Sequence, residues 1–326
     1  MRSGKISEAV LKRSVLKEIH TKNDMVLEGA GVGNDAAVLR GDCDMAVAAT
    51  TVTLGENTPA MTGIYRVMAD LACKGAGADA IIMNVIMPER FDERILKNIM
   101  RQSQMLCKKY GIQIAGGHTE ATGAAKMPIV CYTGIGKRKY KVSGEIKPGD
   151  KIYITKWIGL EGGYQLYRMK KEELGKRFPG SFFDLFDRIP MMYDITEEAE
   201  IACQNGVTYL HNLSNGGVMN ALWELSVKGK CGIKVDFKKI PVRQEIIEVC
   251  EYFDLNPYRM LSGGSLLMTA PAEYDIVSVL NEHDIPTALI GEVTDDNDKI
   301  IMNEDEVRYL DTPGRDELWK IIDGEA

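Results

Sequence analysis

Apolar residues in the first half of the chain recur with two different periods, which predicts alternating helices and strands. Within residues 5–20, 61–74 and 92–110, apolar residues recur at intervals of three and four. This spacing places them on one face of a helix, so we expect a helix in each range. Short apolar runs of strand length lie at residues 36–39, 45–49, 80–86, 112–115 and 127–134. Asp92 and Gly111 are placed to begin and end the third helix, because aspartate caps helix N-termini and glycine follows helix C-termini.

The turn Lys147-Pro148-Gly149-Asp150 restarts this pattern, and we place a domain boundary near residue 145. Beyond it, helical spacing is found at residues 162–174, 196–205, 217–228, 243–252 and 273–283. Runs of strand length are found at residues 151–155, 208–210, 232–237, 265–270, 287–293 and 299–302. The alternation lacks the even rhythm of a doubly wound parallel sheet. We therefore expect an α+β fold with two domains, residues 1–145 and 146–326.

Composition and charge narrow the class of protein. The 326 residues carry a formal net charge of −7 and no block of lysine or arginine, whereas a nucleic-acid groove needs a basic footprint. No apolar run approaches the roughly 20 residues of a membrane span, and the N-terminus lacks the apolar centre of a secretory signal. Seven scattered cysteines without a C-x-x-C pair indicate thiols that are mostly reduced and buried. We expect a cytoplasmic protein that binds neither nucleic acid nor membrane.

Gly31-Val32-Gly33-Asn34-Asp35 is the first segment with the residue types for chemistry. Its two glycines would let backbone N–H groups approach a phosphate closely. Asp35 would bind Mg²⁺, which prefers carboxylate and phosphate oxygens. A strand follows instead of a helix and no third glycine arrives, so the segment is neither a dinucleotide-binding fingerprint nor a Walker A loop. A tight turn with a solvated aspartate explains it equally well.

Two further segments of the first half offer polar side chains. Asp70 lies on the polar stripe Gly63, Arg66, Asp70, Lys74 of its helix, where surface ion pairs with Arg66 and Lys74 would account for it. Gly116-Gly117-His118-Thr119-Glu120 separates two apolar runs and offers an imidazole, a hydroxyl and a carboxylate. We expect this segment to form a loop at the end of a buried strand, and a plain polar hairpin loop is the alternative.

Glycine-rich turns also precede predicted elements of the second half. The segments GLEGG (159–163) and HNLSNGG (211–217) each lead into a helix, whose N-terminal N–H groups attract anions. Simple capping by Ser214 or Asn215 is the alternative for the second turn. The segment LSGGS (261–265) enters a strand and brings another glycine pair.

In their order along the chain, these segments resemble the AIR synthase (aminoimidazole ribonucleotide synthase) superfamily over residues 5–295. The resemblance rests on GVGNDAAVL, the strand ending in Thr50-Thr51, DLACKGA, GGHTE, GLEGG, HNLSNGGV, LSGGSLL and ALIGEV. The superfamily includes thiamine-monophosphate kinase, selenophosphate synthetase and the hydrogenase maturation factor of the HypE type. The chain resembles the HypE branch and its AIR-synthase-related neighbours most.

The resemblance implies an N-terminal α/β domain that dimerises through its sheet, and a C-terminal α/β sandwich. It implies a homodimer that binds ATP and acts on a small-molecule substrate, with Mg²⁺ held against the phosphates by acidic residues. The shared chemistry is phosphorylation of an oxygen, usually of a carbonyl or an amide, followed by removal of that oxygen. The strands predicted at 80–86 and 127–134 would supply the apolar sheet face of the dimer.

The resemblance also assigns site residues position by position. Asp35 and Asp70 are the expected metal ligands, and His118 and Glu120 are the candidate catalytic residues. His118 would also suit a softer metal, and Glu120 would replace a missing carboxylate. The residues expected to contact ATP are Gly31, Gly33, Asn34, Gly116, Gly117, Thr119, Gly162 and Gly163.

The chain departs from the family pattern at several positions. Thr51, His118 and Asn212 stand where the family usually has acidic residues, and fewer carboxylates attract a hard divalent cation less strongly. HypE-type factors end in a cysteine that carries the carbamoyl group, whereas the tail 322–326 has none and the last cysteine is Cys250.

These observations leave three functions to weigh. The first is an ATP-dependent enzyme, ligase-like or kinase-like, that activates an oxygen on a small molecule. The second is a catalytically degenerate dimer that regulates or scaffolds a partner, which the missing acidic residues would explain. The third is hydrogenase maturation with the thiol supplied by a partner maturation protein. We take the first as our prediction.

Overall fold

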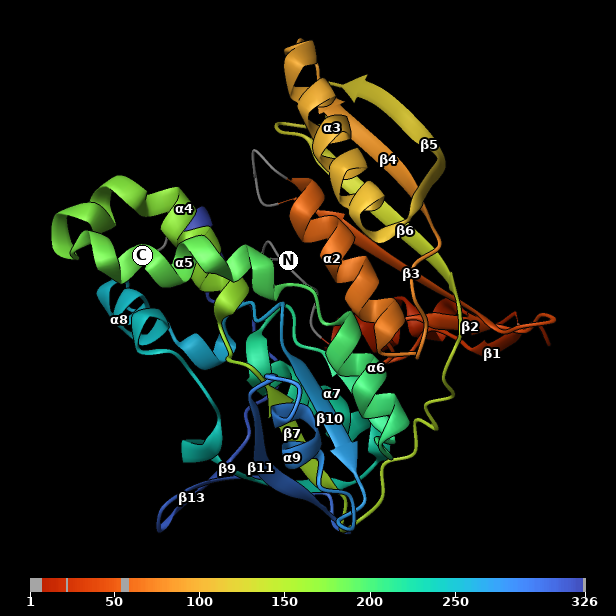
Figure 1. The fold of residues 1–326 in the computed structure, drawn as a ribbon, viewed down its shortest axis with the longest axis vertical. Helices are drawn as coiled ribbons and strands as arrows, with labels where there is room; N and C mark the ends of the chain where they lie inside the picture. The colour runs from red at the N-terminus through yellow and green to blue at the C-terminus, as the bar shows by residue number, and fades with distance from the viewer. Residues whose placement is uncertain (1–7, 22, 54–58, 325–326) are drawn as a thin grey trace. The chain divides into compact units, whose positions relative to one another are not determined.

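The computed structural model describes residues 8–21, 23–53 and 59–324 (Figure 1). Contacts divide the chain into two compact units. The N-terminal unit comprises residues 22–29 and 35–141, and the C-terminal unit comprises residues 1–21, 30–34 and 142–326. Neither unit is one continuous stretch of chain.

A six-stranded sheet forms the N-terminal unit, with the strand order β1-β2-β3-β6-β4-β5. Its strands are β1 (Val26–Glu28), β2 (Ala37–Leu39), β3 (Met45–Val52), β4 (Ala80–Pro88), β5 (Gln113–Thr122) and β6 (Ile129–Lys137). The neighbours pair antiparallel except β4 and β5, which are parallel. A parallel pair needs a crossover connection, and the helix α3 supplies it.

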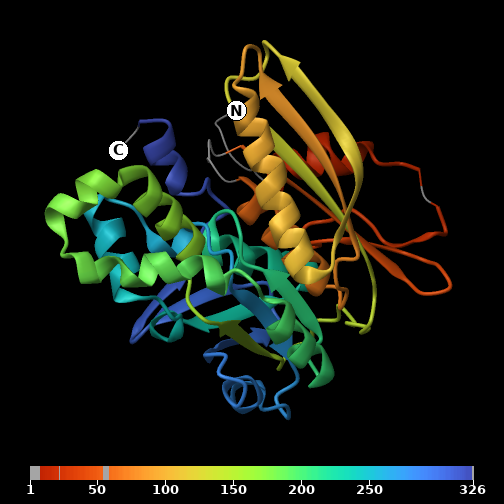
Figure 2. The same ribbon diagram turned by 45° about the horizontal axis from the view of Figure 1, so that its top comes forward.

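Two helices, α2 (Pro59–Ala72) and α3 (Glu93–Tyr110), cover one face of this sheet (Figures 1 and 2). Alternate residues of β4 and β6, such as Met83 and Tyr132, are buried on this face. A Cβ atom at Gly63 of α2 would stand 2.2 Å from the ring of Tyr132. Gly63 therefore lets α2 approach the sheet closely, whereas Arg66 and Asp70 of the same predicted polar stripe are partly exposed.

The ends of α3 are those predicted from the sequence. The carboxylate of Asp92 accepts a hydrogen bond from the N–H of Arg94, and Gly111 ends the helix with a φ of 69°. This left-handed conformation suits glycine because it has no Cβ.

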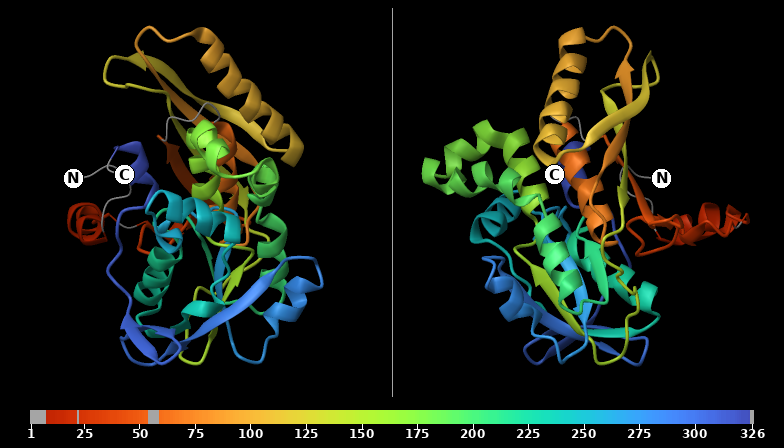
Figure 3. Two further views of the ribbon diagram at one scale, coloured as in Figure 1. Left: turned by 90° about the vertical axis from the view of Figure 1, so that its left-hand side faces the viewer. Right: turned by 45° about the vertical axis from the view of Figure 1, so that its right-hand side comes forward.

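Neither α2 nor α3 covers the other face of the sheet (Figure 3), and apolar residues lie on that face. These residues alternate with the buried ones along β4 and β6 and are only partly shielded from solvent: Ile82, Ile86, Ile129 and Ile135. The predicted strands at 80–86 and 127–134 thus present an apolar face within this unit.

The expectation of a loop at residues 116–120 is wrong, because β5 runs unbroken from Gln113 to Thr122. Glycine weakens strands and usually marks turns, which is why the pair Gly116-Gly117 suggested a loop. Pairing with β4 holds the segment extended, with a register shift between Ile81 and Ile82.

A seven-stranded sheet organises the C-terminal unit, with the strand order β13-β12-β9-β11-β7-β10-β8. Its strands are β7 (Lys151–Thr155), β8 (Tyr209–Asn212), β9 (Gly232–Asp236), β10 (Leu266–Ala270), β11 (Thr287–Thr294), β12 (Lys299–Asn303) and β13 (Glu306–Tyr309). β9 and β12 pair in parallel, whereas the other neighbours pair antiparallel.

The helices of the C-terminal unit are α1 (Glu8–Ser14), α4 (Leu160–Arg177), α5 (Asp184–Arg188), α6 (Thr196–Gln204), α7 (Gly217–Gly229), α8 (Gln244–Tyr252), α9 (Ile276–Asn281) and α10 (Leu318–Ile322). Single 3₁₀ turns lie at Leu16–Glu18, Gly180–Phe183, Ile189–Met192, Phe237–Lys239 and Pro257–Arg259. Leu222 and Leu225 of α7 pack into a core with Ile154, Ile233 and Ile290 of the strands.

Most predicted elements are present, and the α+β class is confirmed. The helix predicted at 5–20 is shorter, spanning Glu8–Ser14 with one 3₁₀ turn after it, and residues 5–7 lie outside the described residues. No helix within the described ranges is long and apolar enough to cross a bilayer.

Candidate functional site

Two acidic residues singled out from the sequence, Asp35 and Asp70, come together around a buried thiol in the N-terminal unit. Asp70 lies in the last turn of α2, and Cys73 comes directly after this helix. Asp35 lies shortly before β2. The side chains of Asp35 and Cys73 are hydrogen-bonded. Burial, and then the negative charges of Asp35 and Asp70, raise the pKa of the Cys73 thiol well above its ordinary value. The thiol therefore stays protonated and donates to the carboxylate.

A buried charge cluster fixes the end of α2 beside these acids. The ammonium of Lys74 is buried and lies 2.8 Å from a carboxylate oxygen of Glu28 on β1. The guanidinium of Arg138 lies 3.6 Å from the same carboxylate, and its Nε donates to the carbonyl of Lys74 at 3.0 Å. The ammonium of Lys74 is therefore buried in an ion pair with Glu28 of β1, whose side chain is 27% exposed, and does not lie on the surface as the helical stripe suggested.

The chemistry of Asp35 and Asp70 fits a magnesium ion whose remaining ligands are phosphate and water. Mg²⁺ typically takes one or two protein carboxylates in such sites. Among the residues that the structure describes, no three His, Cys, Asp or Glu side chains are arranged to hold a metal. A cage made of protein ligands alone, as in structural zinc sites, therefore does not fit this part of the chain.

Residues 31–34 belong to the C-terminal unit, where they pack against β8 and α7. The phenol of Tyr209 donates to the carbonyl of Gly33 at 3.2 Å, and the ammonium of Lys228 donates to Oδ1 of Asn34 at 2.6 Å. Gly33 has a φ of 72°, and a Cβ there would stand 2.9 Å from the carbonyl oxygen of Glu224. The close approach to α7 is thus sufficient reason for glycine at this position. Gly31 accepts a bond from the N–H of Asn34, which closes the turn.

A histidine–glutamate pair lies next to Tyr209, the residue whose phenol bonds to the turn of residues 31–34. Nε2 of His211 is 3.1 Å from a carboxylate oxygen of Glu224, and the two side chains are 5% and 13% exposed. The ring of Tyr209 stacks on that of His211, with centroids 6.0 Å apart. His211 was expected in a turn that leads into a helix, whereas Tyr209, Glu224 and Lys228 were not singled out, because no local motif marks them.

The turn at residues 211–217 contacts the C-terminal segment of the chain where α7 begins. A carboxylate oxygen of Asp316 accepts from the N–H of Gly216 at 2.7 Å, and Asp316 is buried. Gly216 is the N-cap of α7, and no side chain at that position caps the helix. Asp316 of the C-terminal segment therefore engages the N-cap N–H of α7, and the carbonyl of Ser214 accepts from the N–H of Gly217.

Gly162 and Gly163 lie in the first turn of α4 and are buried. Their N–H groups donate to the carbonyls of Leu261 and Gly159, each at 2.8 Å. A Cβ atom would stand 2.1 Å from Met260 at position 162 and 2.4 Å from Ile246 at position 163. Packing accounts for both glycines, and their N–H groups are already engaged within the protein.

The predicted catalytic pair lies on the edge strand β5. Nε2 of His118 and a carboxylate oxygen of Glu120 are 3.2 Å apart, and their side chains are 69% and 52% exposed. The register with β4 places His118 beside Asn84, on the sheet face opposite to α2. Within this unit the structure therefore does not bring the pair to Asp35 and Asp70. The same strand carries Gly116, Gly117 and Thr119.

Family models match most of the chain. Residues 33–137 match the N-terminal domain of AIR synthase related proteins, and residues 147–303 match the C-terminal domain. The chain belongs to the AIR synthase related protein family. The resemblance inferred from the order of the short segments is thereby confirmed.

Individual relatives are distant but cover most of the chain. A carbamoyl dehydratase HypE of Rhizobium leguminosarum bv. viciae is 23% identical over 72% of this chain and 68% of its own length. A thiamine-monophosphate kinase of Pyrococcus horikoshii is 25% identical over 77% of this chain and 76% of its own length.

Solved structures establish the same fold. A HypE–HypF complex matches with a TM-score of 0.76 at 20% identity, covering 94% of this chain and 100% of the matched chain. The hydrogenase maturation protein HypE in complex with ATP matches with a TM-score of 0.72 at 20% identity, covering 95% of each chain.

Proposed function

We propose that this protein binds ATP with Mg²⁺ and transfers the γ-phosphoryl group to an oxygen atom of a small molecule. The observation that carries the proposal is the convergence of Asp35 and Asp70 around Cys73. Two carboxylates at one place are the protein ligands that a magnesium–phosphate site needs. A relative with the same fold holds ATP, and another is named thiamine-monophosphate kinase, which supports a nucleotide as the phosphoryl donor.

Each of these side chains has a role in the proposed reaction. Asp35 and Asp70 would hold the metal, and a bound Mg²⁺ would supply neutralisation of phosphate charge. Cys73 stays protonated and fixes the orientation of the Asp35 carboxylate through its hydrogen bond. The buried pair of Lys74 and Glu28 keeps this end of α2 in place.

The chemistry activates an oxygen that is otherwise a poor leaving group. The substrate oxygen forms a bond to the γ-phosphorus while the bond to the bridging oxygen breaks, so ADP departs. The phosphorylated oxygen then leaves as inorganic phosphate, by elimination or by attack of a nucleophile. A carbamoyl oxygen is a substrate group of this kind, and the name carbamoyl dehydratase of one relative supports it.

We also propose a homodimer that forms through the uncovered face of the N-terminal sheet. The half-exposed residues Ile82, Ile86, Ile129 and Ile135 form an apolar surface there, and such surfaces commonly mark interfaces. His118 and Glu120 lie on the same face of the sheet and would be at the edge of this interface. The HypE–HypF complex supports a maturation protein as a further partner, which would supply the thiol.

Calorimetric titration with Mg²⁺ and ATP tests the proposed site. We expect the wild-type protein to bind Mg²⁺–ATP and each of Asp35→Asn and Asp70→Asn to weaken binding by roughly tenfold or more, since each removes one metal ligand. Asp42→Asn, an exposed aspartate in the turn before β3, is the matched control and should bind as the wild type does.

Phosphate release separates an enzyme from a nucleotide-binding regulator. Turnover of ATP in the presence of a carbamoylated substrate should disappear in Asp35→Asn and persist in Asp42→Asn. No binding by the wild type at millimolar ATP would remove the proposal, and binding without turnover would favour the regulator.

A further inference from the structure

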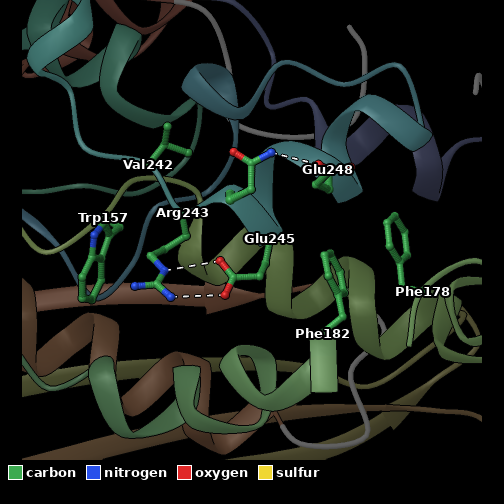
Figure 4. A pocket seen from close by; sticks show the side chains of 8 residues that line it. Trp157, Phe178, Phe182, Val242, Arg243, Glu245 and Glu248 are labelled. Carbon is green, nitrogen blue, oxygen red and sulfur yellow. Dashed lines mark hydrogen bonds and ion pairs between the residues drawn. The ribbon is translucent and has the colours of Figure 1, made fainter. Parts of the chain in front are cut away.

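A groove on the C-terminal unit has a lining that the proposed ATP chemistry does not use (Figure 4). Its volume is about 730 Å³, which is in the range of small-molecule sites. The residues that line it are Trp157, Phe178, Phe182, Val242, Arg243, Gln244, Glu245 and Glu248. They come from the segment after β7, from the segment between α4 and α5, and from the start of α8.

One wall of the groove is a rigid aromatic surface. The rings of Phe178 and Phe182 stack with centroids 4.2 Å apart and an angle of 10° between their planes. Tyr252 of α8 meets Phe178 edge-on at 6.3 Å, and Phe186 of α5 supports Phe182 at 6.0 Å. Because these contacts hold the rings, a ligand would meet a surface that is already arranged.

The wall opposite Phe178 and Phe182 is formed by Trp157, Arg243 and Glu245, and the charges of its arginine and glutamate compensate each other. The guanidinium of Arg243 lies over the Trp157 ring, 5.1 Å from its centroid. Glu245 accepts hydrogen bonds from Arg243 at 3.2 and 3.4 Å, so the two charges compensate each other (Figure 4). Burial opposes ionisation of Glu245, but its bonds with Arg243 outweigh this and hold its pKa below the ordinary value.

Glu248 supplies the remaining charge of the groove. It lies one turn after Gln244 on α8, and its carboxylate accepts from the Gln244 amide at 2.8 Å. This partner is neutral, so the charge of Glu248 is not cancelled as that of Glu245 is. The lining as a whole therefore combines aromatic faces with one net negative charge.

We propose that this groove binds a small organic cation with a flat apolar body. The body packs against Phe178 and Phe182, and the positive group lies beside the Glu248 carboxylate. Aromatic faces attract cations through the negative charge of their π-systems, and the carboxylate makes the site selective for that sign of charge. An anion of the same shape meets the uncompensated carboxylate of Glu248 and binds less well, because the charge of Glu245 is already paired with Arg243.

Three indole compounds whose 3-substituents are cationic, neutral and anionic test the proposal by calorimetry on the full chain. The probes are tryptamine, which is cationic, 3-methylindole, which is neutral, and indole-3-propionate, which is anionic. We expect tryptamine to bind most tightly, 3-methylindole to bind roughly fivefold more weakly, and indole-3-propionate to bind most weakly of the three.

Variants then assign the charge and the ring surface to named side chains. Glu248→Gln should weaken tryptamine binding roughly fivefold and leave 3-methylindole binding unchanged. Glu251→Gln, at an exposed glutamate of the same helix that does not line the groove, is the control and should bind tryptamine as the wild type does. Phe182→Leu keeps apolar packing but removes the ring, and should weaken both ligands.

Three results would overturn the proposal. They are equal affinities for the three probes, an equal loss in Glu248→Gln and Glu251→Gln, and no binding heat with tryptamine at about 10 mM. The circular dichroism spectrum of each variant confirms that it is folded before its affinity is compared.

Discussion

The phenol of Tyr209 donates a hydrogen bond of 3.2 Å to the carbonyl of Gly33, which lies 176 positions earlier in the chain. This bond ties the short turn of residues 31–34 to β8, while Lys228 ties the same turn to α7. The conformation of the turn therefore depends on side chains of the second half of the sequence. Tyr209→Phe removes only this donor and should lower the stability of the fold by about 1 kcal/mol, measured from the melting temperature.

Gly33→Ala should be more harmful than Tyr209→Phe. The new Cβ would face the carbonyl of Glu224 at 2.9 Å from a residue with a φ of 72°, and we expect a loss of about 1–3 kcal/mol. Gly175→Ala is the matched control, because an added Cβ in that part of α4 meets no atom within 4 Å. A helical alanine should leave stability unchanged or raise it by up to about 1 kcal/mol. Equal melting temperatures for the two alanine variants would contradict this account.

A buried ion pair at the end of β7 should be costly to break. The ammonium of Lys156 lies 2.8 Å from Glu198, with side chains 11% and 3% exposed, and Thr155 donates to the same carboxylate at 2.7 Å. Lys156→Met leaves this carboxylate buried without its cation, and we expect a loss of about 3–5 kcal/mol. Adding Glu198→Gln to that variant should restore much of the loss, because the amide carries no charge.

The solvent-exposed pair of Lys151 and Glu292 is the control for that measurement. Its atoms are 2.7 Å apart, but its side chains are 30% and 44% exposed. Lys151→Met should cost at most about 1 kcal/mol. If thermal unfolding shows the same loss for both lysine variants, burial is not what makes the Lys156 pair important.

The thiol of Cys250 should make the fold less stable in alkaline solution. Burial, and then the carboxylates of Glu317, Asp316 and Glu251, raise its pKa from 9.0 to about 12. As the pH rises above 9, the unfolded chain releases this proton while the folded chain retains it, so stability falls between pH 9 and 12. The loss from this group at pH 10.5 is about 2 kcal/mol.

Melting temperatures measured from pH 8 to 10.5 test that linkage. Cys250→Ala should lose less stability over this range than the wild type, whatever its own loss at pH 8. A variant with alanine at the exposed Cys43 should follow the wild-type dependence. Parallel curves for the wild type and Cys250→Ala would show that the linkage is absent.

The proposed dimer should dissociate when a charge enters the uncovered sheet face. Ile82→Lys places an ammonium in the middle of the apolar surface, so burying it in an interface becomes unfavourable. We expect light scattering after gel filtration to give a dimer mass for the wild type and a monomer mass for this variant. Asn98→Lys adds the same charge at an exposed site on α3 and should remain dimeric. A monomeric wild type would rule out the proposed interface.

Periodicity along the chain predicted the long elements well because each has one buried and one exposed side. α3, with its cap at Asp92 and its end at Gly111, is the clearest case. β5 was misread because two glycines and a run of polar residues imitate a loop, while its pairing with β4 lies outside the segment itself. The short elements β1, β13 and α10 were missed because each has only three to five residues and lies outside the apolar runs that identified other short strands such as β2.

The candidate site was predictable only in part. Asp35 and Asp70 were found through the order of short segments that resemble a family, and chemistry then suggested a metal. Their meeting around Cys73 depends on how α2 packs, which local sequence does not encode. Glu224 and Lys228 were missed for the same reason, since their partners His211 and Asn34 are distant along the chain.

The division of the chain into interleaved segments has a consequence for biosynthesis. Glu8 of α1 accepts a hydrogen bond from the indole of Trp223. More than two hundred further residues must therefore be translated before this partner of α1 has been synthesised. The partners of the turn at 31–34 are also synthesised much later, since Tyr209 lies 176 residues after Gly33 and Lys228 lies 194 residues after Asn34. On the ribosome, the N-terminal unit would acquire its residues first, while the C-terminal unit closes only when the chain is nearly complete. A gene truncated at residue 145 would therefore encode one unit together with two segments that have lost their partners.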